Sequence, residues 1–114
     1  MRTTADIAVE RHGGTVVGRL TGEVDMTNAP LVREQLLDAV PNDVLALVLH
    51  LGGCRYLDSA GIEVIFDLAR RLQRRRQELR LVVPESSPLG RVLTLTEVSS
   101  VAPVHVDLES ALGQ

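Results

Sequence analysis

The chain has 114 residues, of which 45% are hydrophobic and 24% are charged, a composition typical of one soluble globular domain. Its net charge of −3 and its only aromatic residues, Tyr56 and Phe66, argue against a nucleic-acid partner, which would need a basic, base-stacking surface. The single cysteine, Cys54, excludes an internal disulfide, and no apolar run is long enough for a membrane span or a signal peptide. We therefore expect a single cytoplasmic domain over residues 1–114 that does not bind a membrane.

Hydrophobic periodicity predicts elements that alternate between strand and helix. In chain order they are strands at 6–10 and 16–20 joined by a glycine turn, a helix between 28 and 41, a strand at 44–49, a helix at 62–72, a strand at 79–83, a short helix around 89–93, a strand at 101–106 and a helix at 108–112. The segments 21–28 and 51–57 are expected to be loops. This β-β-α-β-α-β-α-β-α order predicts an α/β domain with a mixed, mainly parallel sheet flanked by about four helices.

No set of residues predicts an enzyme or a metal site. His12, His50 and His105 lack the paired spacing of metal ligands, and no phosphate-binding glycine loop is present. His50 stands out only because it ends the expected central strand, where α/β sheets place their sites. The Ser59-Ala60-Gly61 sequence lacks the leading glycine of a nucleophile elbow, so a small hydrolase would need a base near Ser59 that the sequence does not identify. We expect no catalytic residue, cofactor or metal.

One basic cluster interrupts an otherwise acidic composition. Its members are Arg70, Arg71, Arg74, Arg75, Arg76 and Arg80. Cations near the end of a helix complement its dipole, and a solvated face needs charge. These arginines are therefore expected to form a solvated helix face, in preference to an anion- or RNA-binding patch.

The segment Leu57–Ile62 carries the strongest functional signal, because its Ser59 stands where a loop enters a helix. One interpretation is structural: the serine hydroxyl caps the helix, although Ile62 stands where the Glu or Gln of a capping box would be. The other interpretation is phosphorylation, which would place about two negative charges at the positive end of the helix dipole. Asp58 would feel the added charge. The residues alone leave both interpretations open.

Two motifs resemble those of the STAS family, and more closely those of its bacterial anti-sigma factor antagonists. Leu20-Thr21-Gly22-Glu23-Val24-Asp25, followed by Ala29, is similar to the family segment L-x-G-x-[LIV]-D-x-x-x-A. Leu57-Asp58-Ser59-Ala60-Gly61-Ile62 is similar to the segment hydrophobic-D-S-[STA]-G-[LI]. The motifs stand in the family's order, and the expected elements agree from about residue 6 to 111. The resemblance implies a single STAS domain over that core.

The resemblance also implies partner switching in transcription regulation. Unphosphorylated antagonists of this kind bind an anti-sigma factor that is an ATP-dependent serine kinase, and a sigma factor is released. The kinase phosphorylates the antagonist and a serine phosphatase reverses the step. Here Ser59 would be the phosphoacceptor, and Gly61 would let the helix start pack against the partner. The implied partner-binding residues are Asp25, Asp58, Ser59, Ala60, Gly61, Ile62 and Glu63.

The free protein is expected to be a monomer, although the apolar edge of the two N-terminal strands could support a dimer. Three residues depart from the family pattern. Ala60 replaces a second hydroxyl residue, and His50 replaces Asp or Asn. Glu63 stands where glycine is common, and its charge would either lower the affinity for a phosphorylating partner or tune which kinase is accepted. We hypothesise that His50 makes the surroundings of Ser59 sensitive to pH. The alternative function is an unphosphorylated STAS scaffold subunit of a stress-signalling or lipid-transport complex.

Overall fold

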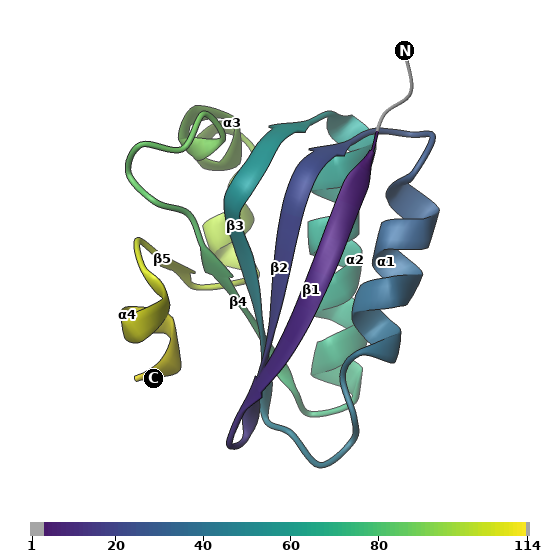
Figure 1. The fold of residues 1–114 in the computed structure, drawn as a ribbon, viewed down its shortest axis with the longest axis vertical. Helices are drawn as coiled ribbons and strands as arrows, with labels where there is room; N and C mark the ends of the chain where they lie inside the picture. Colours follow the sequence, from purple (N-terminus) through teal and green to yellow (C-terminus); the bar gives the residue numbers. More distant parts are fainter. Residues whose placement is uncertain (1–3, 114) are drawn as a thin grey trace.

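The computed structural model describes residues 4–113 as a five-stranded sheet with helices on both faces (Figure 1). The strands are β1 (Ala5–His12), β2 (Thr15–Val24), β3 (Ala46–Leu57), β4 (Glu78–Val82) and β5 (Val104–His105). The helices are α1 (Ala29–Asp38), α2 (Ser59–Arg74), α3 (Gly90–Leu95), the 3-10 turn η1 (Val98–Ser100) and α4 (Leu108–Leu112). The strands lie in chain order; β1 is antiparallel to β2, and the remaining neighbours are parallel. The predicted α/β class and mainly parallel sheet are confirmed.

The sheet separates two apolar clusters of unequal size. The larger lies under α1 and α2, which cover one face, and it takes in Leu47, Leu49 and Leu51 of β3. The smaller lies on the other face under α4, where Val17, Val48, Val82 and Ala111 meet. Ala46 to Leu49 are almost fully buried because β3 is covered from both sides. No helix within residues 4–113 is both long and apolar enough to cross a bilayer.

Strands β2 and β3 are longer than the sequence pattern predicts. The segments 21–24 and 51–57, expected to be loops, continue the parallel pairing as far as Val24 opposite Leu57. The register shifts twice on the way, between Arg19 and Thr21 and between Gly22 and Glu23. Such irregularities admit glycine and polar residues without ending the ladder, so residues that resemble loop signals lie inside a strand. The longer strands bring both motifs to the same end of the sheet.

Gly22 is held in a backbone conformation that few other residues adopt. Its φ is +104°, and a Cβ there would lie 2.3 Å from the carbonyl oxygen of Thr4. The next residue, Glu23, donates its backbone N–H to that same carbonyl at 2.9 Å. The glycine of the first motif therefore lets the chain before β1 pass close against the end of β2.

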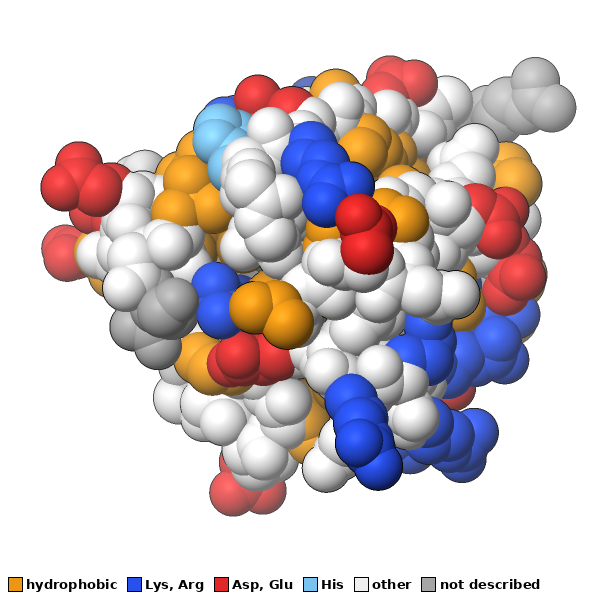
Figure 2. All heavy atoms as spheres, turned by 90° about the horizontal axis from the view of Figure 1, so that it is seen from below, with side chains coloured by type: hydrophobic (Ala, Val, Ile, Leu, Met, Phe, Trp, Pro, Cys, Tyr) orange, Lys and Arg blue, Asp and Glu red, His pale blue; other side chains and the backbone are white. Residues whose placement is uncertain are grey.

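The arginine cluster divides between two faces of the molecule. Arg70, Arg71 and Arg74 belong to α2, and Figure 2 shows basic side chains gathered on one side of the end where that helix finishes. Arg80 does not join them, contrary to expectation. It is a β4 residue on the other face, buried beneath α4, where its Nη1 donates to the carbonyl of Ala111 at 3.0 Å. Strand β4 alternates its side chains across the sheet and so separates this residue from α2.

Candidate functional site at the start of helix α2

The end of β3 passes directly into α2, and Asp58 caps the helix. Its carboxylate accepts hydrogen bonds from the backbone N–H groups of Ala60, at 2.9 Å, and Gly61, at 3.0 Å. Ser59 is the first helical residue, not the cap. The structural interpretation of Ser59 as a capping residue is therefore wrong, because the preceding side chain already satisfies the N–H groups that a serine cap would bind.

Ser59 is exposed, and its hydroxyl forms no hydrogen bond with residues 4–113. It stands at the N-terminal end of a helix of 16 residues, where the dipole is positive. Two of the N–H groups that would stabilise an anion there are bonded to Asp58. An anion added to Ser59 would therefore share the helix end with a carboxylate.

The loop after β2 is built from side-chain hydrogen bonds. Asp25 accepts from the backbone N–H of Thr27, at 2.9 Å, and from its hydroxyl. The Asn28 side chain accepts from the backbone N–H of Asp25 at 3.0 Å and donates to the carbonyl of Glu23 at 3.0 Å. These bonds fix the backbone of the segment that carries Asp25, so its position is set by the fold.

The two motifs meet through the backbone. The N–H of Asp58 donates to the carbonyl of Val24 at 3.2 Å, which ties the start of α2 to the end of β2. A Cβ at Gly61 would lie 3.2 Å from that carbonyl and 3.0 Å from the side chain of Leu57. Gly61 is thus buried against its own domain, and not placed at the surface where a partner would pack against it. Ile62 is also buried.

The sequence-predicted site residues therefore divide into two groups. Ser59 and Glu63 are exposed, and Asp25, Asp58 and Ala60 are partly exposed. These five side chains can face a partner. Gly61 and Ile62 support the surface from beneath by fixing how closely α2 approaches the sheet.

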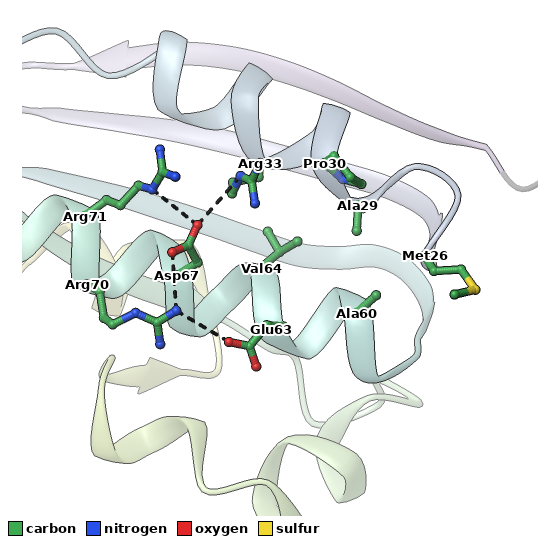
Figure 3. A pocket seen from close by; sticks show the side chains of 10 residues that line it. All are labelled: Met26, Ala29, Pro30, Arg33, Ala60, Glu63, Val64, Asp67, Arg70 and Arg71. Carbon is green, nitrogen blue, oxygen red and sulfur yellow. Dashed lines mark hydrogen bonds and ion pairs between the residues drawn. The ribbon is translucent and has the colours of Figure 1, made fainter.

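A groove of about 390 Å³ between α1 and α2 adjoins this surface (Figure 3). Its apolar lining consists of Met26, Ala29, Pro30, Ala60 and Val64. Met26 stands at its mouth and is 76% exposed. The sequence reasoning missed this groove; the one local signal is an unburied methionine directly after the motif residue Asp25.

One carboxylate organises the charged side of the groove. Asp67 lies 3.3 Å from Arg70, 3.3 Å from Arg71 and 3.7 Å from Arg33, measured between charged side-chain atoms. Arg70 also reaches Glu63 at 3.4 Å. Arg33 also pairs with the neighbouring Glu34 at 3.1 Å, so three guanidinium groups and three carboxylates form one ion-pair network along this side of the groove.

His50 is distant from the predicted site. It lies within β3, on the sheet face shared with Val48, away from α2, and its Nδ1 accepts a hydrogen bond from the N–H of Gly52 at 3.1 Å. Burial lowers the pKa of this imidazole, and the positive charge of Arg19 lowers it further. Among the described residues, His50 makes no direct contact with Ser59 that would support the hypothesis of a pH-sensitive Ser59 environment. No group of three or more potential metal ligands occurs in the part of the chain that the structure describes.

Comparisons with known proteins agree with both the fold and the motifs. The STAS domain family model matches residues 6–111. The anti-sigma F factor antagonist of Paenibacillus polymyxa is 27% identical over 109 residues, which cover 95% of this chain and 92% of that protein. The crystal structure of an anti-sigma factor antagonist from Mycobacterium paratuberculosis has a TM-score of 0.84 at 25% identity, with 96% of this chain and 92% of that chain covered.

A more distant structure shows the same fold with a phosphoryl group present. The Bacillus cell fate determinant SpoIIAA in its phosphorylated form has a TM-score of 0.65 at 22% identity, with 95% of this chain and 97% of that chain covered. The family match, which extends over nearly all of the described residues, leads to one conclusion: the chain belongs to the STAS domain family.

Proposed function

We propose that this protein is an anti-sigma factor antagonist, a binding protein without catalysis of its own, whose unphosphorylated form binds an anti-sigma factor and so releases a sigma factor. The observation that carries the proposal is the exposed Ser59 hydroxyl, which forms no hydrogen bond with the described residues and stands beside the capping carboxylate of Asp58. Two similar proteins that match almost the whole chain are named as anti-sigma factor antagonists, which supports the proposal.

The proposed switch is electrostatic. A phosphoryl group on Ser59 would add about two negative charges next to Asp58. Because Asp58 already holds the N–H groups of Ala60 and Gly61, the added charge would be poorly compensated. In an interface, like-charge repulsion and lost solvation would then weaken binding by about 2–5 kcal/mol. The phosphorylated form of SpoIIAA retains this fold, which supports a change of surface charge and not of architecture.

The proposed partners are those that the resemblance to anti-sigma factor antagonists implies. The anti-sigma factor is an ATP-dependent serine kinase that both binds the Ser59 surface and phosphorylates it, and a serine phosphatase restores the binding form. The residues that would contact the kinase are the partly or fully exposed ones of the motif region: Asp25, Asp58, Ser59, Ala60 and Glu63. The cycle takes place in the cytoplasm, where sigma factors act.

The test uses four forms of the full chain as baits in lysate of the source cells: wild type, Ser59→Ala, Ser59→Asp and Ser99→Asp. Ser99 is also an exposed serine, in η1, outside the proposed surface. We expect an ATP-binding serine kinase to be retained by wild type, Ser59→Ala and Ser99→Asp and lost with Ser59→Asp. With that kinase purified, Ser59→Asp should weaken its affinity roughly 30-fold or more.

Two results would contradict the proposal. If all four baits retain the same partners with equal affinity, the charge at Ser59 controls nothing and the protein acts as an unphosphorylated scaffold. If Ser99→Asp loses the kinase as Ser59→Asp does, the effect is one of net charge and not of the site. Incubation of the purified kinase and antagonist with labelled ATP adds a direct measurement, since Ser59→Ala should accept no phosphate.

A further inference from the structure

Strand β1 is a long, regular strand at the edge of the sheet. It pairs with β2 from Ala5 opposite Gly22 to His12 opposite Thr15, without a register shift. No strand among residues 4–113 pairs with its outer side. The other edge strand, β5, has only two residues. A regular edge of this length presents unpaired backbone groups that another strand can bind.

The turn between β1 and β2 determines which backbone groups face outward. Gly13, with a φ of +60°, and Gly14 form a two-residue hairpin turn. The residues flanking such a turn, His12 and Thr15, form a hydrogen-bonded pair. Hydrogen-bonded and non-bonded positions alternate from there, so Ile7, Val9 and Arg11 direct their N–H and C=O groups away from β2 and toward the open edge.

Charge then selects one register for a second copy. In an antiparallel pair about a two-fold axis, outward residues must oppose outward residues, and two registers keep most of the strand paired. The register centred on Ala8 places Asp6 opposite Glu10 on both sides of the axis, which like-charge repulsion disfavours. The register centred on Val9 places Asp6 opposite His12, Ile7 opposite Arg11 and Ala8 opposite Glu10, with no like charges opposed.

Two exposed apolar side chains, Val9 and Leu31, lie near the interface that the Val9-centred register would form. Val9 is 50% exposed and lies opposite Gly18. A Cβ added at Gly18 would lie 2.9 Å from the side chain of Leu36 in α1, so this position faces α1. Val9 therefore lies on the α1 face, and the two Val9 side chains would meet at the axis. Leu31 of α1 is 61% exposed. It lies about 200° around the helix from Arg33, which pairs with Asp67 of α2. Leu31 therefore faces the side of α1 where β1 lies.

We propose that two copies of this protein associate through β1, antiparallel and centred on Val9, into one continuous sheet. The association departs from the monomer expected from the family resemblance. It leaves the Ser59 surface open in each copy, because α2 packs on α1, β3 and β4, inward from this edge. The dimer and the phosphorylation switch are independent of each other.

Sedimentation equilibrium of the wild-type chain, up to millimolar concentration, tests the association. We expect a monomer–dimer equilibrium whose dissociation constant rises at least about tenfold in Val9→Lys, since two like charges would oppose each other at the axis. Val106→Lys is the matched control, because Val106 is also 50% exposed but lies beyond β5. A wild-type chain that stays monomeric, or a dimer that Val9→Lys leaves unchanged, overturns the proposal.

Cysteine cross-linking tests the register without relying on a destabilised variant. Opposed Cα atoms at a hydrogen-bonded position lie about 5.5 Å apart, within disulfide range. Val9→Cys should therefore form a disulfide-linked dimer on mild oxidation, faster than Ala8→Cys. The native Cys54 is buried and gives the wild-type background. Faster cross-linking of Ala8→Cys than of Val9→Cys would overturn the Val9-centred register. If both variants cross-link no faster than the wild type, the interface itself is overturned.

Discussion

The carboxylate of Asp58 performs the helix-capping role that leaves the Ser59 hydroxyl free. Asp58 accepts the N–H groups of Ala60 and Gly61, whereas Ser59, one residue later, points to solvent without a hydrogen bond to the described residues. Helix capping thus rests on Asp58, and the proposed phosphorylation would fall on the adjacent side chain. A substitution at one of them should leave the role of the other intact.

Asp58→Ala is expected to lower the free energy of unfolding by about 1 kcal/mol, since it removes a cap that binds two N–H groups. Ser59→Ala should change it by less than about 0.5 kcal/mol, as is usual for an exposed side chain without partners. Urea denaturation of both variants measures the difference, with Asp58→Asn as a control that retains a capping oxygen. Equal losses for Asp58→Ala and Ser59→Ala would show that the serine shares the cap.

Gly22→Ala is expected to destabilise the protein by about 1–3 kcal/mol, because the residue has a positive φ and its new methyl group would meet the Thr4 carbonyl. Gly90→Ala is the control: it lies at the start of α3 with nothing within 4 Å of the added atom. That change should be neutral or slightly stabilising. The two midpoints in urea measure the contrast, and similar midpoints would show that the chain before β1 moves aside freely.

Local patterns predict most of this fold but not the extent of its strands. Asp58-Ser59 and the spacing of Ile62, Ile65 and Leu72 place α2 correctly, because capping and periodicity are local properties. The end of β3 was missed because Gly52 and Gly53 resemble a loop. The ladder continues through them because β3 accommodates two extra residues where Arg19 to Val24 of β2 pair with His50 to Leu57, and such a shift of register depends on the neighbouring strand.

The candidate site was predicted in the same partial way. The sequence places Asp58 and Ser59 at the start of a helix, where the structure has them, but it assigns Gly61 to a partner surface when that residue is buried against Leu57 and Val24. The groove beside the site depends on Arg33 of α1 meeting Asp67 of α2. Charges on separate helices give no sequence signal for such a meeting, since only the packing of α1 against α2 brings them together.

Asp67→Asn is expected to destabilise the protein by about 1–2 kcal/mol, between the values for exposed and buried ion pairs. The Asp67 side chain is only 20% exposed. The loss of its charge leaves Arg71 without a carboxylate among the described residues and leaves Arg33 and Arg70 with one each, so the three guanidinium groups repel one another more strongly. The deficit should shrink in about 1 M salt, which screens that repulsion. Asp38→Asn is the control, an exposed α1 carboxylate without an ion pair to the described residues. A salt-independent deficit would point to packing as its cause.

His50 is expected to make stability fall as the solution becomes acidic. Burial and Arg19 hold its folded-state pKa below the ordinary 6.5, so the unfolded chain binds a proton more readily. The contribution of neutral His50 is therefore fully present above about pH 6.5 and is lost as pH falls through the lower folded-state pKa. His50→Gln should flatten the unfolding free energy between about pH 7 and 5, the range in which an imidazole titrates.

Two measurements decide this prediction together. An NMR titration of the His50 imidazole in the folded protein should give a pKa below 6.5, and urea midpoints across the same pH range should fall for wild type but not for His50→Gln. The carboxylates of Glu10 and Asp43, whose arginine partners lower their pKa values, lose their contributions only at more acidic pH, so they do not mimic the effect. A wild-type curve as flat as that of His50→Gln would show that the imidazole remains solvated enough in the folded state to protonate without a loss of stability.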